Sequence, residues 1–499
     1  MTALLDIYKK SLIDGALPAY DRKALKVGIV HIGVGGFHRA HQTLYLEKYL
    51  RAHPDDLNWG ILGIGLMPND TAFLAQLNQQ EGLYTLQLVD QTQRTYYPIG
   101  VIKSTLSGAD VPAGAIAAMA DPAVKIISMT ITEGGYLYDF ETDQFMADHP
   151  LVRHDLAPQN TPKCIHGFLA RALRQRMLDG AGPVTLLSCD NVPGNGQVLQ
   201  RALTAFIALT GDAALLAWLD THVSFPNSMV DRITPIPTAA LQQQVKADLG
   251  VDDLCPVLGE PFGQWVVEDH FIAGRPALET VGVEFTDAVE DYEKLKLRIL
   301  NGTHILIALI GYVDGLTYIH ECMEDPLILQ RARELMDLDA HPAIEGFSDA
   351  AINDYKHLIV QRFSNPVTLD SVERVASDGF NKLKNYLMPI LRDGMSRGRI
   401  SPLISLAFAC YARHLKGIND RGQAIRVNEP RLTMAERQTY SDDVEAILRL
   451  ESFFGQDESA QVNSFIAQTQ ALYEVIKTHG VRDALNSAIN ASSEEQRVN

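Results

Sequence analysis

The chain has 499 residues, of which 46% are hydrophobic and 21% are charged, so it is long enough for more than one compact core. Its net charge of −18 disfavours a nucleic-acid partner, because phosphate binding needs a basic face. No apolar run reaches the roughly 18 residues of a membrane span, and residues 1–15 lack the apolar stretch of a secretory signal. The five cysteines have no CxxC or metal-ligand spacing, which is typical of reduced thiols. We therefore expect a cytoplasmic protein with no membrane, nucleic-acid or metal partner.

Short apolar segments alternate with helical patterns through the first half of the chain. The expected buried strands are "KVGIVHIG" (26–33), "WGILGIGL" (59–66), "VKIISMTIT" (124–132) and "PVTLLSC" (183–189). A helical pattern at 37–50 follows the first strand, 83–90 and 95–104 resemble an added hairpin, and 281–285 resembles a last strand. The alternation predicts an α/β domain built on a doubly wound parallel sheet.

The pattern changes near residue 286. Apolar residues at helical spacing occur in 327–340, 404–417, 442–455 and 462–480, and few strand-like runs accompany them. We therefore expect the α/β domain to span residues 1–285 and a mainly α-helical domain to span residues 286–499. The polar tail at 490–499 is expected to be frayed.

A glycine-rich turn, "HIGVGGFHRAH" (31–41), follows the first expected strand. Gly33 and Gly35 form G-x-G, which allows a tight turn and lets a pyrophosphate approach bare backbone beside a helix N-terminus. His38 stands where the third glycine of G-x-G-x-x-G is expected, so the motif is weak alone, and its position after a strand strengthens it. We predict a Rossmann-like dinucleotide site that includes Ile32, Gly33, Val34, Gly35, Gly36, Phe37, His38 and Arg39.

The segment "GLMPND" (65–70) follows the second expected strand and ends in Asp70. A carboxylate at this position accepts hydrogen bonds from ribose hydroxyls and repels a 2′-phosphate. Since no arginine is adjacent, Asp70 favours NAD over NADP. The alternative is an ordinary loop aspartate.

The stretch "KLKLRILNGTHILIALIG" (294–311) places Lys296, Asn301 and His304 in an otherwise apolar helix. At 100° per residue, the three fall within an arc of roughly 140°, which is one face of a helix. Polar groups on a half-buried face need partners or a function. The alternative is that all three are satisfied core residues.

This trio suits alcohol oxidation by hydride transfer, in which a hydroxyl loses its proton as the hydride leaves the same carbon. An ordinary lysine is a poor base, with a pKa of about 10.4, but burial and a nicotinamide cation lower the pKa. Asn301 and His304 then stabilise the oxygen as it gains charge, without a metal. Tyr292 and Lys296 also form the Y-x-x-x-K pair of short-chain dehydrogenases, but those are single-domain enzymes, so we interpret this spacing as chance.

Several motifs occur in one order along almost the whole chain, from about residue 18 to beyond 470. They are "IGVGGFHRAHQ", "TITEGGY" (130–136), "SCDNVPGNG" (188–196), "SFPNSMVDRITP" (224–235), "KLRILNGTH" (296–304) and "RFSNP" with "ERVASDG" (362–379). This order resembles the polyol-specific long-chain dehydrogenases, and within them the mannitol 2-dehydrogenases. The combination of K-x-x-x-x-N-x-x-H with MVDRITP is specific to that family.

The resemblance implies a zinc-independent, NAD-dependent enzyme that interconverts D-mannitol and D-fructose. Its implied catalytic group is the general base Lys296 with the oxyanion-stabilising pair Asn301 and His304, and Glu293 lies on the proton path. The implied substrate contacts are Asn191, Asp231, Arg374 and Lys382, and Asp70 resembles the residue that selects NAD. Without the resemblance, Asp231 and Arg232 would be interpreted as a plain ion pair, and Arg374 and Lys382 as solvated surface.

The segment "DGFNKLKNYL" (378–387) leaves the substrate open. Fructuronate and tagaturonate reductases of the same family carry "DGSQK" followed by "LPQR" there, and this chain lacks that proline. Mannitol enzymes tend to have "KFPKF", so this chain matches neither group fully. A hexuronate reductase is the main alternative, because Arg374 and Lys382 could pair with a substrate carboxylate. A non-catalytic NAD-binding protein is a further alternative. A monomer is compatible with the sequence, since the family is often monomeric.

Overall fold

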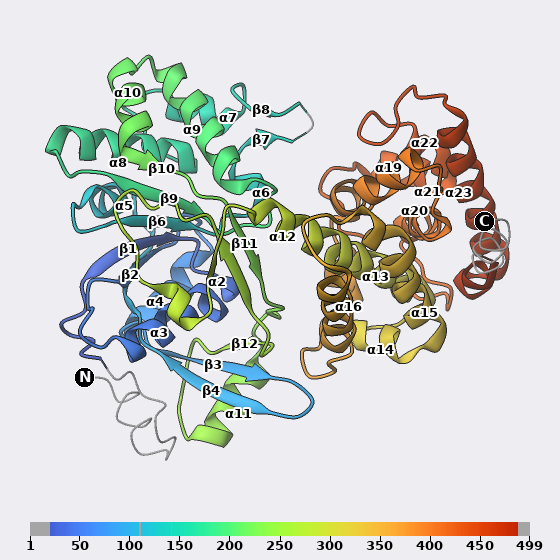
Figure 1. The fold of residues 1–499 in the computed structure, drawn as a ribbon, viewed down its shortest axis with the longest axis horizontal. Helices are drawn as coiled ribbons and strands as arrows, with labels where there is room; N and C mark the ends of the chain where they lie inside the picture. The colour runs from blue at the N-terminus through green and yellow to red at the C-terminus, as the bar shows by residue number, and fades with distance from the viewer. Residues whose placement is uncertain (1–19, 109–110, 141, 488–499) are drawn as a thin grey trace. The chain divides into compact units, whose positions relative to one another are not determined.

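The computed structural model describes residues 20–108, 111–140 and 142–487, shown in colour in Figure 1. The N-terminal stretch tested for a secretory signal and the polar tail at 490–499 lie outside these residues. The chain divides into two compact units, Met1–Glu290 and Asp291–Asn499. The division therefore falls a few residues after the boundary expected from the sequence, within a helix.

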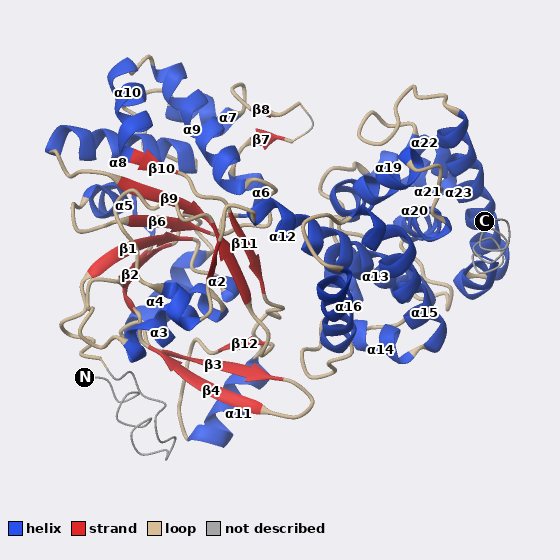
Figure 2. Ribbon diagram, in the orientation of Figure 1, coloured by secondary structure: helices blue, strands red, loops and turns tan. Residues whose placement is uncertain are grey.

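A six-stranded parallel sheet forms the centre of the first unit, in the order β10-β9-β6-β1-β2-β5. Its strands are β1 (Val27–Ile32), β2 (Gly60–Ile64), β5 (Ile102–Leu106), β6 (Ile126–Met129), β9 (Val184–Ser188) and β10 (Val223–Ser224). The chain runs outward from β1 to one edge and then returns to build the other half from β6 (Figure 2). This order is that of a doubly wound sheet, which confirms the predicted fold class.

Helices cover both faces of this sheet. The helices of the first unit are α2 (Gly36–Ala40), α3 (Gln42–Ala52), α4 (Asp70–Gln79), α5 (Val111–Ala120), α6 (Thr132–Gly135), α7 (Pro150–Asp155), α8 (Ile165–Asp179), α9 (Asn195–Thr210), α10 (Ala213–His222) and α11 (Ala239–Leu249). Alternate strand residues enter different cores: Val30 and Ile32 pack with α5, α8 and α9, whereas Ile29 packs with α3. Burial on both faces explains why the strand sequences are apolar throughout.

Smaller sheets flank the central one. Their strands are β3 (Tyr84–Val89), β4 (Arg94–Ile99) and β12 (Val257–Gly259), then β11 (Ser228–Asp231), β13 (Gln264–Val267) and β14 (Glu284–Phe285), and finally β7 (Tyr138–Asp139) with β8 (Gln144–Phe145). Of the helices of this unit, α11 packs near β3, β4 and β12 rather than on the central sheet. The antiparallel pairing of β3 and β4 confirms the expected hairpin. Its second strand was predicted too long, because 102–106 leaves the hairpin to become β5 of the central sheet. The expected last strand is β14, which lies outside the central sheet.

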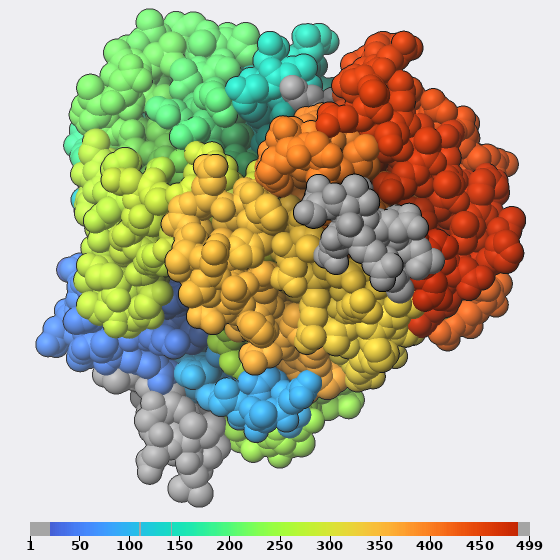
Figure 3. Space-filling view, turned by 45° about the vertical axis from the view of Figure 1, so that its right-hand side comes forward, coloured from blue at the N-terminus to red at the C-terminus, as the bar shows by residue number. Residues whose placement is uncertain are grey.

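The second unit is helical. Its helices are α12 (Val289–Leu295), α13 (Gly302–Asp314), α14 (Ile319–Glu324), α15 (Pro326–Glu334), α16 (Asp349–Phe363), α17 (Val372–Ala376), α18 (Gly379–Lys382), α19 (Met388–Ser396), α20 (Pro402–Leu415), α21 (Met434–Asp442), α22 (Val444–Leu448) and α23 (Ala460–His479). Three π-turns, η3 (Lys296–Asn301), η4 (Leu335–Ala340) and η6 (Leu383–Leu387), interrupt them. The central helix α13 packs on α17 and α20, and α20 packs on α23. The atoms of the C-terminal helices are orange to red in Figure 3.

One continuous helix, Val289–Asp314, is long and apolar enough to cross a membrane by length and composition. Most of it is enclosed by protein, since 78% of its most apolar window is buried. A central helix of a helical domain has the same properties, and its position between α17 and α20 accounts for its apolar sequence.

Candidate active site

The glycine-rich turn connects β1 to α2 at the point where the strand order of the central sheet reverses. Gly33 has a φ of +91°, and a Cβ atom there would lie 2.1 Å from the carbonyl oxygen of Thr130, so only glycine fits. Around Gly35 there is open space, because the nearest atom to an added Cβ is 3.9 Å away. The turn thus offers bare backbone at the carboxyl end of the sheet, as a bound pyrophosphate requires.

The helix after this turn is shorter than predicted. The expected continuous helix at 37–50 breaks at His41, whose ring nitrogen lies 2.8 Å from the carbonyl oxygen of Gln264. The side chains of His38 and Arg39 are buried, and Arg39 donates a 2.6 Å hydrogen bond to the carbonyl oxygen of Cys255. These two predicted cofactor contacts therefore have their backbone groups, and not their side chains, at the turn.

A buried histidine of β1, His31, contacts the residues that hold the glycine-rich turn. His31 Nδ1 lies 2.9 Å from Ser128 Oγ and Nε2 lies 3.1 Å from Thr130 Oγ1, and Thr130 Oγ1 donates to the carbonyl oxygen of Gly33 at 2.7 Å. The ring stacks on that of His38 with 3.4 Å between centroids. Burial lowers the pKa of His31 to about 3, so the imidazole is neutral. His31 was not among the site residues predicted from the sequence.

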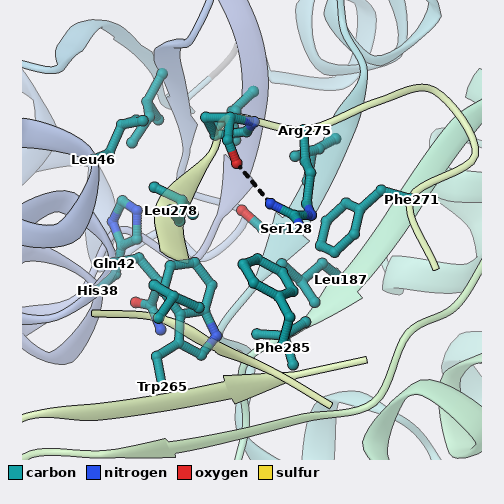
Figure 4. A pocket seen from close by; sticks show the side chains of 16 residues that line it. His38, Gln42, Leu46, Ser128, Leu187, Trp265, Phe271, Arg275, Leu278 and Phe285 are labelled. Atoms are coloured by element: carbon teal, nitrogen blue, oxygen red, sulfur yellow. Dashed lines mark hydrogen bonds between the residues drawn. The ribbon is translucent and has the colours of Figure 1, made fainter. Parts of the chain in front are cut away.

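A small cavity of about 40 Å³ lies against the same sheet, beside His38 and Gln42 (Figure 4). Its walls are mainly apolar, and Arg275, which donates to the carbonyl oxygen of Pro276, lines one side. Gln42 and Trp265 place buried polar atoms here that have no hydrogen-bond partner among the described residues. A space of this size holds a few water molecules and is far too small for a nucleotide, so the cavity belongs to the core.

Strand β2 ends at Ile64, two residues earlier than expected, and Asp70 lies in the segment that follows it. Asp70 is the first residue of α4, and its Oδ2 accepts a 3.1 Å hydrogen bond from the backbone N–H of Met67. The carboxylate folds back against Gly65, where an added Cβ would be 3.0 Å from Oδ2. It remains half-buried near the carboxyl end of β2.

Asn191 is exposed in the loop after β9, next to the buried Asp190. Asp190 accepts 2.9 Å hydrogen bonds from the N–H groups of Ile131 and Thr132 and a 2.7 Å bond from the Tyr136 hydroxyl. Burial raises the pKa of Asp190, although these donors oppose the shift. Asp190 therefore ties the loop after β6 to the loop that carries Asn191, and it also holds Thr132 at a strained φ of +61°.

Asp231 is the last residue of β11 and is buried opposite Gln264 of β13. Its neighbour Arg232 is also buried and donates a 2.5 Å hydrogen bond to the carbonyl oxygen of Glu260. Asp231 therefore has a fixed place at a strand end rather than on a mobile surface loop.

In the second unit, Lys296, Asn301 and His304 lie on the continuous helix formed by α12, η3 and α13. The regular α-helix expected from the sequence is wrong for residues Lys296–Asn301, which form a π-turn. Because a π-turn pairs residues five apart, Asn301 lies almost directly above Lys296 rather than well around the helix. The π-turn thus narrows the arc of the helix surface that Lys296, Asn301 and His304 occupy.

Lys296 and Glu293 are both buried.

Two polar atoms of this trio lack protein partners: Asn301 Oδ1 and His304 Nε2 are buried and accept or donate no hydrogen bond in the described part of the chain. The His304 ring stacks on Phe363, and its Nε2 lies 3.2 Å from Asp370 Oδ2 without the direction of a hydrogen bond. Burial lowers the pKa of His304, and Asp370 only partly opposes this. The imidazole is therefore neutral at neutral pH and has an unused nitrogen.

Asp370 contacts both His304 and Arg374, a cationic residue that is predicted to bind the substrate. Its Oδ1 accepts hydrogen bonds from Arg374 Nε at 2.7 Å and Nη2 at 2.6 Å. Burial alone would raise the pKa of Asp370, but the His304 and Arg374 contacts lower it to about 2. Asp370 was not among the residues predicted from the sequence, although its position four residues before Arg374 is a spacing typical of helical ion pairs.

Lys382 is half-buried near this group, and its Nζ donates a 2.7 Å hydrogen bond to the carbonyl oxygen of Val375. Burial and the charge of Arg374 lower the pKa of Lys382 to about 8. Arg374 is exposed. Asp370 thus holds the side chain of Arg374, and the carbonyl oxygen of Val375 in α17 holds that of Lys382.

Metal ligands were not expected from the sequence. Among residues 20–108, 111–140 and 142–487 there is no group of three or more His, Cys, Asp and Glu side chains arranged to hold a metal ion. All five cysteines fall within these residues, where they are buried thiols outside disulfides.

A doubly wound dinucleotide-type domain followed by a helical domain with a lysine, an amide and an imidazole on one helix defines a class of two-domain dehydrogenases. The family model for the mannitol dehydrogenase Rossmann domain matches residues 27–280, and that for the mannitol dehydrogenase C-terminal domain matches residues 288–477. The chain therefore belongs to the mannitol dehydrogenase family.

Characterised relatives differ in the polyol that they are named for. The chain is 44% identical to D-arabinitol 4-dehydrogenase of Ralstonia nicotianae, over 78% of this chain and 83% of the relative. It is 41% identical to mannitol 2-dehydrogenase of Cereibacter sphaeroides, over 83% and 86%. The solved ternary complex of Pseudomonas fluorescens mannitol 2-dehydrogenase with NAD and D-mannitol is 38% identical, with a TM-score of 0.87 and coverage of 95% and 96%.

Proposed function

We propose that the protein is an NAD-dependent polyol dehydrogenase that interconverts D-mannitol and D-fructose without a metal ion. The observation that carries this proposal is a pair of buried atoms without a hydrogen-bond partner among the described residues, Asn301 Oδ1 and His304 Nε2. Both residues lie on the same helix as the buried Lys296. Buried polar atoms without partners are uncommon, and a bound alcohol oxygen would satisfy them. The named activities of the relatives support the same class of substrate.

The residues of the glycine turn fit a dinucleotide, because open space surrounds Gly35 and the turn lies at the reversal of strand order. NAD, when bound, accepts the hydride from the carbinol carbon. The N–H groups of the turn bind its pyrophosphate, and His31 holds the Gly33 carbonyl in place through Thr130. Asp70 contacts the adenosine ribose and disfavours NADP.

Lys296 takes the hydroxyl proton in the oxidation direction and returns it to the ketone oxygen in the reduction direction. A neutral amine is required for the first of these steps, and Lys296 is buried away from bulk water. Glu293 lies one turn earlier on the same helix and is also buried, which suits a carboxylate that passes the proton onward.

Asn301 and His304 orient the reacting oxygen and stabilise its developing charge. The neutral His304 ring has one nitrogen free for a substrate oxygen, and the Asn301 amide offers a donor or an acceptor according to its orientation. Arg374 and Lys382 donate hydrogen bonds to distal hydroxyls, while Asn191 and Asp231 bind near the carbinol.

D-Arabinitol is the second candidate substrate, because a relative named for that activity is 44% identical. A hexuronate remains a third, since Arg374 and Lys382 would pair with a carboxylate. The deciding experiment measures NADH formation with D-mannitol, D-arabinitol and D-sorbitol, and NADH consumption with D-fructose and fructuronate. We expect turnover with D-mannitol and D-fructose. Turnover with D-arabinitol or fructuronate alone would reassign the substrate, and NADH binding without any turnover would indicate a non-catalytic protein.

A further inference from the structure

A buried glutamate holds the short helix that carries Lys382. Glu429 is fully buried in the segment between α20 and α21, far from α18 in sequence. Its Oε1 accepts a 2.6 Å hydrogen bond from the N–H of Gly379, and its Oε2 lies 3.4 Å from the N–H of Phe380. The carboxylate thereby satisfies the first N–H groups of α18, which has no cap from its own preceding side chain.

The start of α18 is shaped around this carboxylate. A Cβ atom at Gly379 would lie 3.0 Å from Glu429 Oε1 and 2.8 Å from a ring carbon of Tyr411, so a side chain there would displace both. Asp378 has a left-handed φ of +55°, and its N–H donates a 2.8 Å hydrogen bond to the carbonyl oxygen of Asn428. Strained backbone of this kind persists only where surrounding contacts hold it.

The segment around Glu429 is itself fixed to two helices. Arg437 of α21 donates to the carbonyl oxygens of Val427 and Glu429 at 3.1 and 2.9 Å. Tyr312 of α13, the helix that carries His304, accepts a 3.0 Å hydrogen bond from the N–H of Arg426. Glu429 is thus a rigid link between α18 and the rest of the helical unit.

We propose that Glu429 is a positioning residue for substrate recognition: by capping α18 it fixes Lys382, and with it the distal end of the polyol site. This inference rests on the proposed function, which gives Lys382 its role at the distal hydroxyls. Glu429 does not touch the substrate, so its effect is expected on substrate affinity rather than on the chemical step.

The cap depends on the charge state of Glu429. Burial raises its pKa to about 7, partly opposed by the Gly379 and Phe380 N–H groups. The charged or titratable groups that face it are Asp378 and Lys382 from the α18 segment, Tyr411 from α20 and Arg437 from α21. Above neutral pH the carboxylate accepts from both N–H groups, whereas the protonated form or an amide turns a donor toward one of them.

The test compares Glu429→Gln with the exposed control Glu458→Gln and with Lys382→Ala. At about pH 8, Glu429→Gln should raise the KM for D-mannitol about tenfold, the worth of one charge-assisted hydrogen bond, with kcat and the KM for NAD nearly unchanged. The ratio of mannitol KM between variant and wild type should fall toward one as the pH falls below about 7. Glu458→Gln should match the wild type. Glu429→Asp, which keeps the charge, should recover part of the affinity and serves if the amide variant fails to fold.

An unchanged mannitol KM in folded Glu429→Gln, alongside a raised KM in Lys382→Ala, would overturn the positioning role and leave the proposed function intact. A lowered melting temperature with unchanged KM values would also overturn it, by showing a purely structural cap. No effect of Lys382→Ala would instead remove Lys382 from the proposed site, and the inference with it.

Discussion

The Nε2 atom of His304 lies 3.2 Å from Oδ2 of Asp370, and this contact joins the helix that carries Lys296 to the segment that carries Arg374. Asp370 also binds Arg374 through its other oxygen. One buried carboxylate therefore contacts both a proposed oxyanion-stabilising residue, His304, and a proposed substrate-binding residue, Arg374. The reacting and distal ends of the proposed polyol site are therefore coupled within the helical unit.

Replacement of Asp370 by asparagine should lower kcat/KM for D-mannitol by roughly 10- to 100-fold, because Arg374 loses its charged hydrogen-bond acceptor and the negative charge beside His304 Nε2 is removed. Its carboxyl has a pKa of about 2 in the folded protein and an ordinary value of 3.8. A lowered pKa gives stability that is present above the ordinary value and lost as the pH falls through the folded value, here about 2 kcal/mol. The free energy of unfolding, measured against pH, should show this difference shrinking between about pH 4 and 2. A constant difference between wild type and variant would contradict the ion pairing.

The contribution of Glu429 to the free energy of unfolding should change with pH in the direction opposite to that of Asp370. Its pKa is raised from 4.5 to about 7 in the folded protein, so its contribution is greatest below the ordinary value and is lost as the pH rises to about 7. The wild type should lose about 3 kcal/mol across this window relative to Glu429→Gln, which does not ionise. Parallel denaturant titrations at several pH values test this, and identical slopes would show that the carboxyl is not shifted.

Two glycines of the turn make a matched pair. Gly33→Ala should destabilise the protein, since its Cβ would meet the Thr130 carbonyl and its φ is +91°. Gly35→Ala should keep a nearly normal melting temperature but weaken NAD binding, because its Cβ points into space that the protein leaves open. Thermal unfolding and NADH fluorescence titration separate the two effects. Normal NADH affinity in Gly35→Ala would move the pyrophosphate away from this turn.

Asp70→Ala should weaken the use of NAD and relax the discrimination against NADP, because the carboxylate that repels a 2′-phosphate is gone. The loss of its hydrogen bond with Met67 is a local effect at the start of α4. The ratio of kcat/KM with NAD to that with NADP is the measurement. If this ratio stays at its wild-type value, Asp70 is only a helix-terminal residue.

Local patterns were enough to predict β1, β2, β6, β9 and the glycine turn, because buried parallel strands and their tight turns depend on neighbouring residues. The division of 95–104 between β4 and β5 was not predictable locally, since β5 pairs with the distant β2. The same limit applies to the π-turn at Lys296, which packs against η4 and η6.

Long-range contacts also decide which polar residues join the site. Asp370 and His304 are distant in sequence, and Glu429 reaches Gly379 across 50 residues. The trio on the helix was visible because its members are close together in the chain. Asp370 lies between the RFSNP and ERVASDG motifs, and Glu429 lies 50 residues after Gly379. Only the folded helical unit therefore shows that Asp370 contacts His304 and that Glu429 contacts Gly379.

The central claim is that Lys296 is the proton acceptor, and the most direct test is the turnover of Lys296→Ala with D-mannitol and NAD, measured beside its affinity for NADH. A positioned general base contributes roughly 10²–10⁴-fold, so kcat should fall by that factor while NADH binding stays as in the wild type. Near-normal turnover of the variant at neutral pH would contradict the account.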